Sequence, residues 1–96
     1  MDTMNKSDLI DTIAEEVQLP GKTASSIVDT ILNTMTETLV KGENVEIRGF
    51  GSFTIRKYES YTGRNPKTGK TTLVKEKKLP FFKVGKDLRE AVDNQK

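Results

Sequence analysis

Residues 56–78 read RKYESYTGRNPKTGKTTLVKEKK and contain almost no apolar side chains. At their centre lies GRNPKTG, residues 63–69, in which glycine, asparagine and proline cluster as a tight turn requires. Two polar stretches flank this turn, Arg56–Thr62 and Lys70–Glu76, and each is typical of a strand. A hairpin this polar has little to bury, so we expect it to project into solvent as an arm.

Two apolar stretches with the period of β-strands flank the arm. The stretch before it is interrupted by Gly-Phe-Gly at residues 49–51, and its alternating apolar residues are Val45, Ile47, Phe53 and Ile55. The stretch after it, Leu79–Phe82, contains Pro80, which suits an edge strand or the start of a strand. This spacing predicts a small sheet of three strands from which the arm extends.

The N-terminal part of the chain has the period of α-helices instead. Asn5 is placed as an N-cap with Asp8 in the capping-box position, and Pro20-Gly21 ends this first helix. A second helix is expected from about Gly21 to Lys41, and Gly42 supplies its stop. Its apolar positions form a continuous stripe and are Ala24, Ile27, Val28, Ile31, Leu32, Met35 and Leu39.

A short third helix is expected after Gly85, with Leu88, Ala91 and Val92 on one side. The expected fold is therefore α+β, with two N-terminal helices, a three-stranded antiparallel sheet bearing a long β-ribbon arm, and a short C-terminal helix. We expect one domain over residues 1–96. Its parts are a helical dimerisation region at 1–43, the sheet at 44–85 with the arm at about 56–78, and the final helix at 86–96.

The core available to one chain is small. Without the arm roughly 70 residues remain, a size at which domains are marginal unless a disulfide, a metal or a partner chain stabilises them. Cysteine is absent, and the apolar stripe of the second helix exceeds what two short helices and a small sheet can cover. We therefore expect a dimer, with a marginally stable monomer as the alternative.

The net charge of +2 is unevenly distributed along the chain. Residues 1–48 hold four basic and nine acidic residues, a net charge of −5, whereas residues 49–96 hold twelve basic and five acidic residues, a net charge of +7. One explanation is a solvated surface with a chance asymmetry. The other is an anion-binding C-terminal half carried on an acidic helical platform, and the basic arm favours it.

Catalysis finds little support in the composition. The chain has no His and no Cys, which removes the usual general base and the commonest metal ligands. Asp8, Asp11, Glu15 and Glu16 lie on the polar face of a solvated helix, without a Gly-rich phosphate loop or an apolar pocket. We expect no catalytic residue, no metal and no cofactor. The absence of a long apolar run and of a basic-then-apolar leader predicts neither membrane insertion nor export.

The arm has the chemistry of a ribbon that binds duplex DNA. Period-two geometry distributes its basic side chains over both faces, where they can follow phosphates. Arg64 and Asn65 carry donors that suit the acceptor-rich minor groove. Pro66 is the rigid apolar residue at the tip, placed to wedge between base pairs. Taken alone, however, Asn-Pro-Lys-Thr-Gly is also an ordinary surface turn.

The combination resembles the HU/integration host factor family over nearly the whole chain. GRNPKTG at residues 63–69 is similar to the arm-tip signature of the family, and VEIRGFGSF at residues 45–53 is most like the integration host factor β subunit. GKDLRE at residues 85–90 is also similar to that subunit. The resemblance implies an intertwined dimer, with sheets beneath the DNA and two arms around its minor groove. It further implies a nucleoid-associated protein of the cytoplasm that bends and compacts duplex DNA, as architectural minor-groove binders do.

The resemblance also implies roles for individual residues. Pro66 intercalates, Arg64 and Asn65 line the groove beside it, and Arg48 contacts DNA from the sheet. Lys78, Lys83 and Lys86 match basic positions along the DNA flank. The complete predicted set of DNA-binding residues is Arg48, Arg56, Tyr58, Tyr61, Arg64, Asn65, Pro66, Lys67, Lys70, Lys75, Lys78, Lys83 and Lys86.

The first arm strand departs from the family pattern. Tyr58 and Tyr61 stand where the family usually carries arginine, and Glu59 and Glu76 add negative charge to the arm. An alternative function follows, in which the arm is an interaction module that binds single-stranded RNA or a protein, with the tyrosines as stacking platforms. Double-stranded DNA, preferably already distorted, is the main expected partner. The second subunit is expected to be an identical chain, and a homologous subunit stays open.

Overall fold

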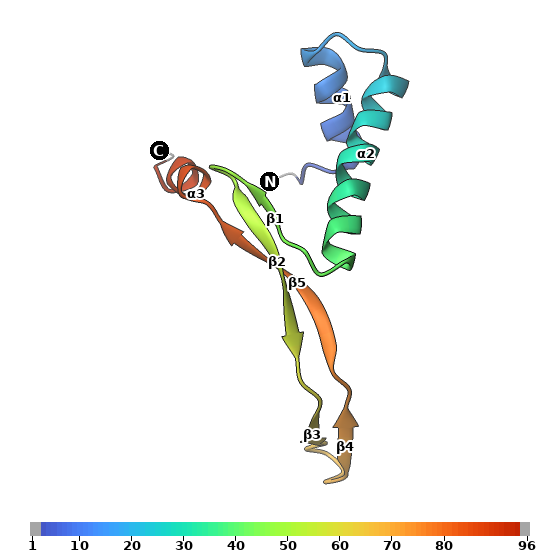
Figure 1. Cartoon of the computed structure of the whole chain (residues 1–96), viewed down its shortest axis with the longest axis vertical. Helices are drawn as coiled ribbons and strands as arrows, with labels where there is room; N and C mark the ends of the chain where they lie inside the picture. The colour runs from blue at the N-terminus through green and yellow to red at the C-terminus, as the bar shows by residue number, and fades with distance from the viewer. Residues whose placement is uncertain (1–2, 95–96) are drawn as a thin grey trace. The chain divides into compact units, whose positions relative to one another are not determined.

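The computed structural model describes residues 3–94, and these residues contain three helices and five strands (Figure 1). The helices are α1 (Lys6–Glu16), α2 (Gly21–Val40) and α3 (Lys86–Asp93). The strands are β1 (Val45–Ile47), β2 (Gly51–Tyr58), β3 (Tyr61–Arg64), β4 (Thr71–Val74) and β5 (Lys77–Val84). The chain divides into two compact units, Met1–Glu37 and Thr38–Lys96.

The N-terminal unit consists of α1 and most of α2. The expected capping box is confirmed at the start of α1, where the backbone N–H of Asn5 donates to Asp8 Oδ2 at 3.0 Å. An ion pair between Lys6 and Asp29 links the two helices. Ala24 and Val28 are the buried hydrophobic residues of the described chain, and both lie in the first half of α2. The helices therefore pack around a very small core.

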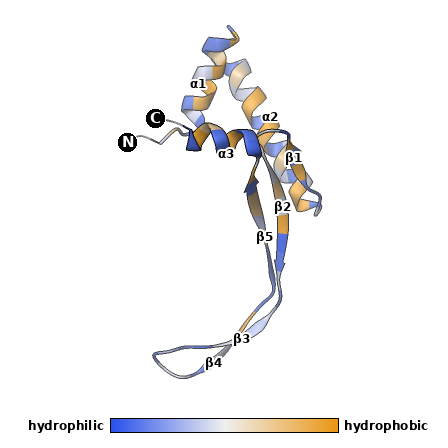
Figure 2. Cartoon of the chain, turned by 90° about the vertical axis from the view of Figure 1, so that its left-hand side faces the viewer, coloured by the Kyte–Doolittle hydropathy of each residue, from blue (hydrophilic) through white to orange (hydrophobic). Residues whose placement is uncertain are grey.

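Five of the seven residues of the apolar stripe on α2 are exposed or half-buried in the single chain. Ile27, Ile31 and Leu32 are 39%, 50% and 43% exposed, and Figure 2 shows apolar residues continuing along the helix. The helix ends at Val40, close to the expected Lys41, and the expected stop at Gly42 is confirmed by its φ of 86°. Because removing apolar surface from water is the main favourable contribution to folding, this stripe requires a further covering surface.

The sheet of the C-terminal unit has the expected three antiparallel strands, in the order β1–β2–β5. Phe82 of β5 is the central ring of an aromatic cluster, with ring centroids 4.8 Å from Phe53 and 5.8 Å from Phe50. Gly51 is buried beneath this cluster, since a Cβ there would lie 2.5 Å from Phe82 Cζ. Pro80 occurs in β5, which is an edge strand as its proline requires. We call the paired strands β2 and β5 the ribbon base.

The arm is interrupted, which corrects the expectation of two continuous strands at Arg56–Thr62 and Lys70–Glu76. Pairing of β2 with β5 stops at Tyr58 and Lys77, and a separate two-stranded sheet of β3 and β4 follows (Figure 1). Residues 59–60 and 75–76, which we call the gap, are all polar. They provide no apolar cross-strand pair to hold the ladder together. We call residues 61–74 the ribbon tip.

The third helix is attached to the turn between β1 and β2. Gly85, its N-cap, donates its N–H to the carbonyl of Phe50 at 2.8 Å, and the N–H of Leu88 donates to the carbonyl of Gly49 at 3.0 Å. Gly49 has a φ of 85°, which a glycine adopts without strain. The expected final helix extended to residue 96, of which residues 95 and 96 lie outside the described range. None of the helices within residues 3–94 is both long enough and apolar enough to cross a bilayer.

Candidate nucleic-acid interface

The two faces of the ribbon base differ. We call the face with Arg56, Lys77 and Lys83 the polar face, although Phe81 lies on it too, and the predicted Lys78 lies on the opposite face. Successive side chains of a strand point to opposite faces, so Phe53 and its partner Phe82 lie on the face opposite Ser52 and its partner Lys83. Arg56 shares the polar face and lies over the ring of Phe81, with its guanidinium carbon 3.6 Å from the ring centroid. This cation–π contact holds Arg56 against the sheet. The polar face is therefore basic, and the side chain of Arg56 on it is held in one position.

A polar hollow of about 360 Å³ brings two of the predicted residues together. Arg48 reaches it from the β1–β2 turn and Lys83 from β5, and Ser52 and Gly85 line it with them. Lys86 follows Gly85 directly as the first residue of α3. Glu46 also lines the hollow, so its two cations outnumber one carboxylate. With the hydroxyl of Ser52 they suit a phosphate group, because charge-assisted hydrogen bonds to phosphate are the strong ones.

The loop at the ribbon tip is closed by its own hydrogen bonds. The N–H of Asn65 donates to the carbonyl of Lys70 at 2.9 Å, and the N–H of Gly69 donates to the carbonyl of Asn65 at 2.7 Å. The side-chain oxygen of Asn65 accepts from the N–H of Lys67 at 2.9 Å, which forms an Asx turn. These bonds hold the exposed Pro66 at the end of the ribbon.

The two arm tyrosines have different surroundings. Tyr58 is 44% exposed and pairs with Lys77 at the end of the ribbon base. Tyr61 pairs with Val74 in the ribbon tip, and its Cε2 lies 3.6 Å from the position that a Cβ on Gly63 would take. Tyr61 thus covers a glycine, although 60% of the residue remains exposed. Its ring has a packing role that sequence reasoning did not foresee.

The remaining predicted residues are spread along the ribbon, and every member of the predicted set is exposed. Arg64 ends β3, Lys67 and Lys70 belong to the tip loop, Lys75 lies in the gap and Lys78 lies in β5. The predicted set leaves out Lys77, which pairs with Tyr58 on the polar face that also holds Arg56. Only the strand register shows that Lys77 lies on this face and that its neighbour Lys78 lies on the opposite one.

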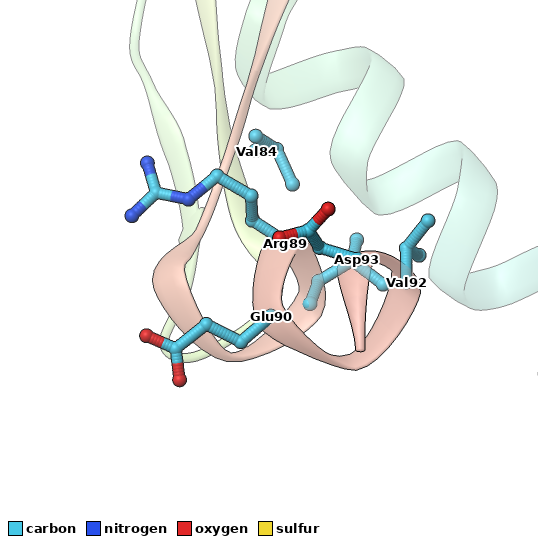
Figure 3. A pocket seen from close by; sticks show the side chains of 6 residues that line it. Val84, Arg89, Glu90, Val92 and Asp93 are labelled. Carbon is cyan, nitrogen blue, oxygen red and sulfur yellow. The ribbon is translucent and has the colours of Figure 1, made fainter. Parts of the chain in front are cut away.

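A second hollow lies beside α3, with a volume of about 650 Å³ (Figure 3). Val84 borders it from β5, and Leu88, Arg89, Glu90, Val92 and Asp93 border it from the helix. Val92 is 70% exposed, and the hollow has a mixed lining, since Arg89, Glu90 and Asp93 are charged. Within residues 3–94, no group of three or more His, Cys, Asp or Glu side chains is placed to hold a metal ion.

Comparison with known proteins identifies the family. A family model described as "Bacterial DNA-binding protein" matches residues 4–93. The chain belongs to this family. "DNA-binding protein HU" of Staphylococcus aureus is 45% identical over 89 residues, which are 93% of this chain and 99% of that protein. "Integration host factor subunit beta" of Herminiimonas arsenicoxydans is 50% identical over 91 residues, 94% of this chain and 90% of that protein.

Solved structures agree with the family assignment. An Anabaena HU–DNA cocrystal structure is similar with a TM-score of 0.84 and 36% identity, covering 96% of this chain and 100% of that chain. HU from Thermotoga maritima is similar with a TM-score of 0.64 and 39% identity, covering 93% and 98% of the two chains. The α+β fold and the resemblance to HU and integration host factor are thereby confirmed. The chain is a DNA-binding architectural protein and not an enzyme, and nothing in these likenesses favours an RNA-binding or protein-binding module.

Proposed function

We propose that this protein binds duplex DNA as a dimer and bends it by inserting Pro66 of each arm into the minor groove. The observation that carries the proposal is the closed tip loop, whose internal hydrogen bonds present an exposed proline beside Arg64 and Asn65. An apolar wedge that partly unstacks a base step kinks the duplex, and the kink lets the DNA meet more protein surface. Arg64 and the amide of Asn65 donate to acceptors on the groove floor.

The basic residues of the ribbon base and of the hollow supply contacts to phosphate. Arg48 and Lys83 share one hollow, and Arg56 is fixed on the same face of the sheet as Lys83. Contacts of this kind fix the position of the protein on the duplex without reading sequence. We therefore infer weak sequence preference and tighter binding to DNA that is already nicked or bent, because bending intact duplex costs energy. This activity places the protein with the chromosomal DNA of the cell.

The exposed stripe on α2 supports the dimer. Ile27, Ile31 and Leu32 each keep more than a third of their surface accessible, and only two hydrophobic residues of the described chain are buried. A second chain that covers these residues contributes the core that one chain lacks. The two compact units then act as one folded domain of residues 1–96. An identical chain is the first choice of partner, and a homologous subunit is the second, since one of the relatives is named as a subunit.

The test uses the purified full chain alone. Light scattering gives its mass, and energy transfer between dyes at the two ends of a short duplex gives the bend. We expect a dimeric mass, a melting temperature that rises with protein concentration, and a bend that saturates with added protein. A monomeric mass with a concentration-independent melting temperature would contradict the dimer. Tighter binding of single-stranded RNA than of any duplex, without bending, would favour the interaction module instead.

A further inference from the structure

The arm contains two glutamates at facing positions. Tyr58 pairs with Lys77 at the end of the ribbon base, and Tyr61 pairs with Val74 at the start of the ribbon tip. Two residues intervene on each strand, so the register carries through the gap without a bulge and sets Glu59 opposite Glu76. Like charges directly opposite each other destabilise a strand pair. The pairing of the ribbon lapses at this very step.

Two lysines lie beside the two glutamates on the same face of the ribbon, since Lys57 and its ladder partner Lys78 come one same-face position before them along the ribbon, and only one ion pair forms among the four. Glu76 forms an ion pair with Lys57 of the ribbon base, with an N···O distance of 3.7 Å. No hydrogen bond or ion pair is made by the side chain of Glu59 within residues 3–94. Lys57 pairs with Lys78 in the ladder, so Glu76 is its diagonal neighbour and shares its face of the ribbon. Glu59 shares that face as well, two positions along the strand from Lys57.

The segments on the two sides of the gap are each held by packing. The ribbon base has the aromatic cluster of Phe53 and Phe82. The ribbon tip has Tyr61 over Gly63, and Val74 lies 3.7 Å from the position of a Cβ on that glycine. The gap between these segments has no such contact, because its residues are Glu59, Ser60, Lys75 and Glu76.

We propose that Glu59 and Glu76 are positioning residues that form a like-charge hinge in the arm and set how tightly the protein discriminates between DNA shapes. Their repulsion keeps the ladder open between two packed segments, so the tip can turn relative to the base. An arm that turns fits grooves of differing trajectory. A continuous arm is preorganised for one trajectory and binds the others less well. The effect on DNA rests on the proposed function, whereas the hinge itself is a property of the free protein.

The first experiment measures amide hydrogen exchange of the free protein by NMR at neutral pH. Glu59→Lys places an opposite charge across from Glu76 and keeps the contact of Lys57 with Glu76. We expect the amides of residues 59–61 and 74–76 to exchange about fivefold more slowly in this variant, since a repulsive cross-strand pair becomes attractive. Glu59→Gln, which removes the repulsion only, should give an intermediate rate.

A charge-matched series separates the hinge from net charge. The double variant Glu59→Lys/Glu76→Lys restores a like-charge pair with a greater positive charge, and it should exchange as fast as the unmodified protein. Glu90→Lys on α3 makes the same change of charge as Glu59→Lys away from the arm, and it should leave exchange in the gap unaltered. Equal exchange rates in the single and double variants, or slowing that follows net charge, would overturn the hinge.

The second experiment compares affinity for nicked and intact duplexes of one sequence. Glu59→Lys should raise the ratio of the two affinities about threefold through preorganisation of the arm, and Glu90→Lys should leave this ratio as it is. Slower exchange with an unaltered ratio would show a hinge without a role in discrimination, which overturns that part of the proposal. Failure of every variant to bend DNA would count against the proposed function and leave the exchange result standing.

Discussion

The ribbon base, β2 with β5, and the ribbon tip, β3 with β4, follow one another along the same hairpin but are stabilised in different ways. The base is built on Phe53 and Phe82, whose rings pack at 4.8 Å above the buried Gly51. The tip has hydrogen bonds within its loop and one tyrosine over one glycine. The base therefore supplies the stability of the ribbon, and the tip supplies groups that are free to contact another molecule. Changes in the base should alter unfolding, and changes in the tip should alter DNA binding.

The largest expected effect is a loss of stability when the ribbon base is disrupted. Phe82→Ala removes the central ring of the aromatic cluster and leaves a void above Gly51. We expect the free energy of unfolding to fall by about 3 kcal/mol, at the lower end of the range for a large aromatic residue because Phe82 is 38% exposed in the single chain. Denaturant unfolding followed by circular dichroism measures this. A loss below about 1 kcal/mol, the size of an ordinary point substitution, would show that the cluster does not hold the base.

The next effect concerns the tip. Pro66→Ala removes the wedge but keeps the neighbouring charges, so end-to-end energy transfer should show a large loss of bending. Affinity for intact duplex should fall about tenfold, and affinity for nicked duplex should fall less because the nick already supplies flexibility. The stability of the protein should stay within about 0.5 kcal/mol of the unmodified chain, as for other surface substitutions. Equal bend angles at saturating protein would mean that Pro66 only stiffens the turn.

A smaller effect is expected on the salt dependence of DNA binding, which reports contacts between lysines and phosphate groups. Lys83→Ala or Lys86→Ala should reduce the slope of log affinity against log salt concentration by roughly one for each phosphate that the lysine neutralises. A dimer carries each lysine twice, so the change can double. Affinity measured at four or more salt concentrations gives the slope. Glu90→Gln, which alters charge on α3 without touching phosphate, is the control, and identical slopes in all variants would remove these lysines from the interface.

The smallest expected effect distinguishes the two tyrosines. Tyr58→Phe removes a hydroxyl on the polar face and should weaken DNA binding by about 1 kcal/mol, the size of one hydrogen bond. Tyr61→Phe keeps the ring over Gly63 and should bind DNA as the unmodified protein does, whereas Tyr61→Ser should loosen the tip and weaken binding. Titration of a labelled duplex measures all three. Equal reductions in affinity for the two phenylalanine variants would mean that both hydroxyls touch DNA.

Much of this fold could be predicted from periodicity and capping residues. The capping box at Asn5 and Asp8, the stop at Gly42 and the helix after Gly85 are local signals, and the structure has each of them. The gap in the arm could not be predicted in this way. It depends on which residue of one strand faces which residue of the other, and Glu59 and Glu76 are far apart in sequence.

The binding site, too, could be predicted only in part, because it depends on contacts between residues that are far apart in sequence. Arg48 and Lys83 are far apart in sequence, and the register of β2 with β5 and the β1–β2 turn bring them to one hollow. The resemblance to the family supplied both residues without that geometry. Tyr61 was treated as equivalent to Tyr58, because strand period alone does not show that a ring covers Gly63. Lys77 was left out although it occupies the polar face.

The hydrogen bond between Lys67 and Asn65 has a consequence for base composition. Because Asn65 Oδ1 accepts the N–H of Lys67, the carbonyl side of the amide is turned towards its own loop, and the NH₂ group remains as a donor for an outside partner. Arg64 only donates. Adenine N3 and thymine O2 accept in the minor groove, whereas guanine presents its own amino donor there. In the proposed complex these donors find acceptors in the minor groove, but at a G·C pair they also face the amino donor of guanine, so we expect the arms to prefer A·T-rich DNA slightly.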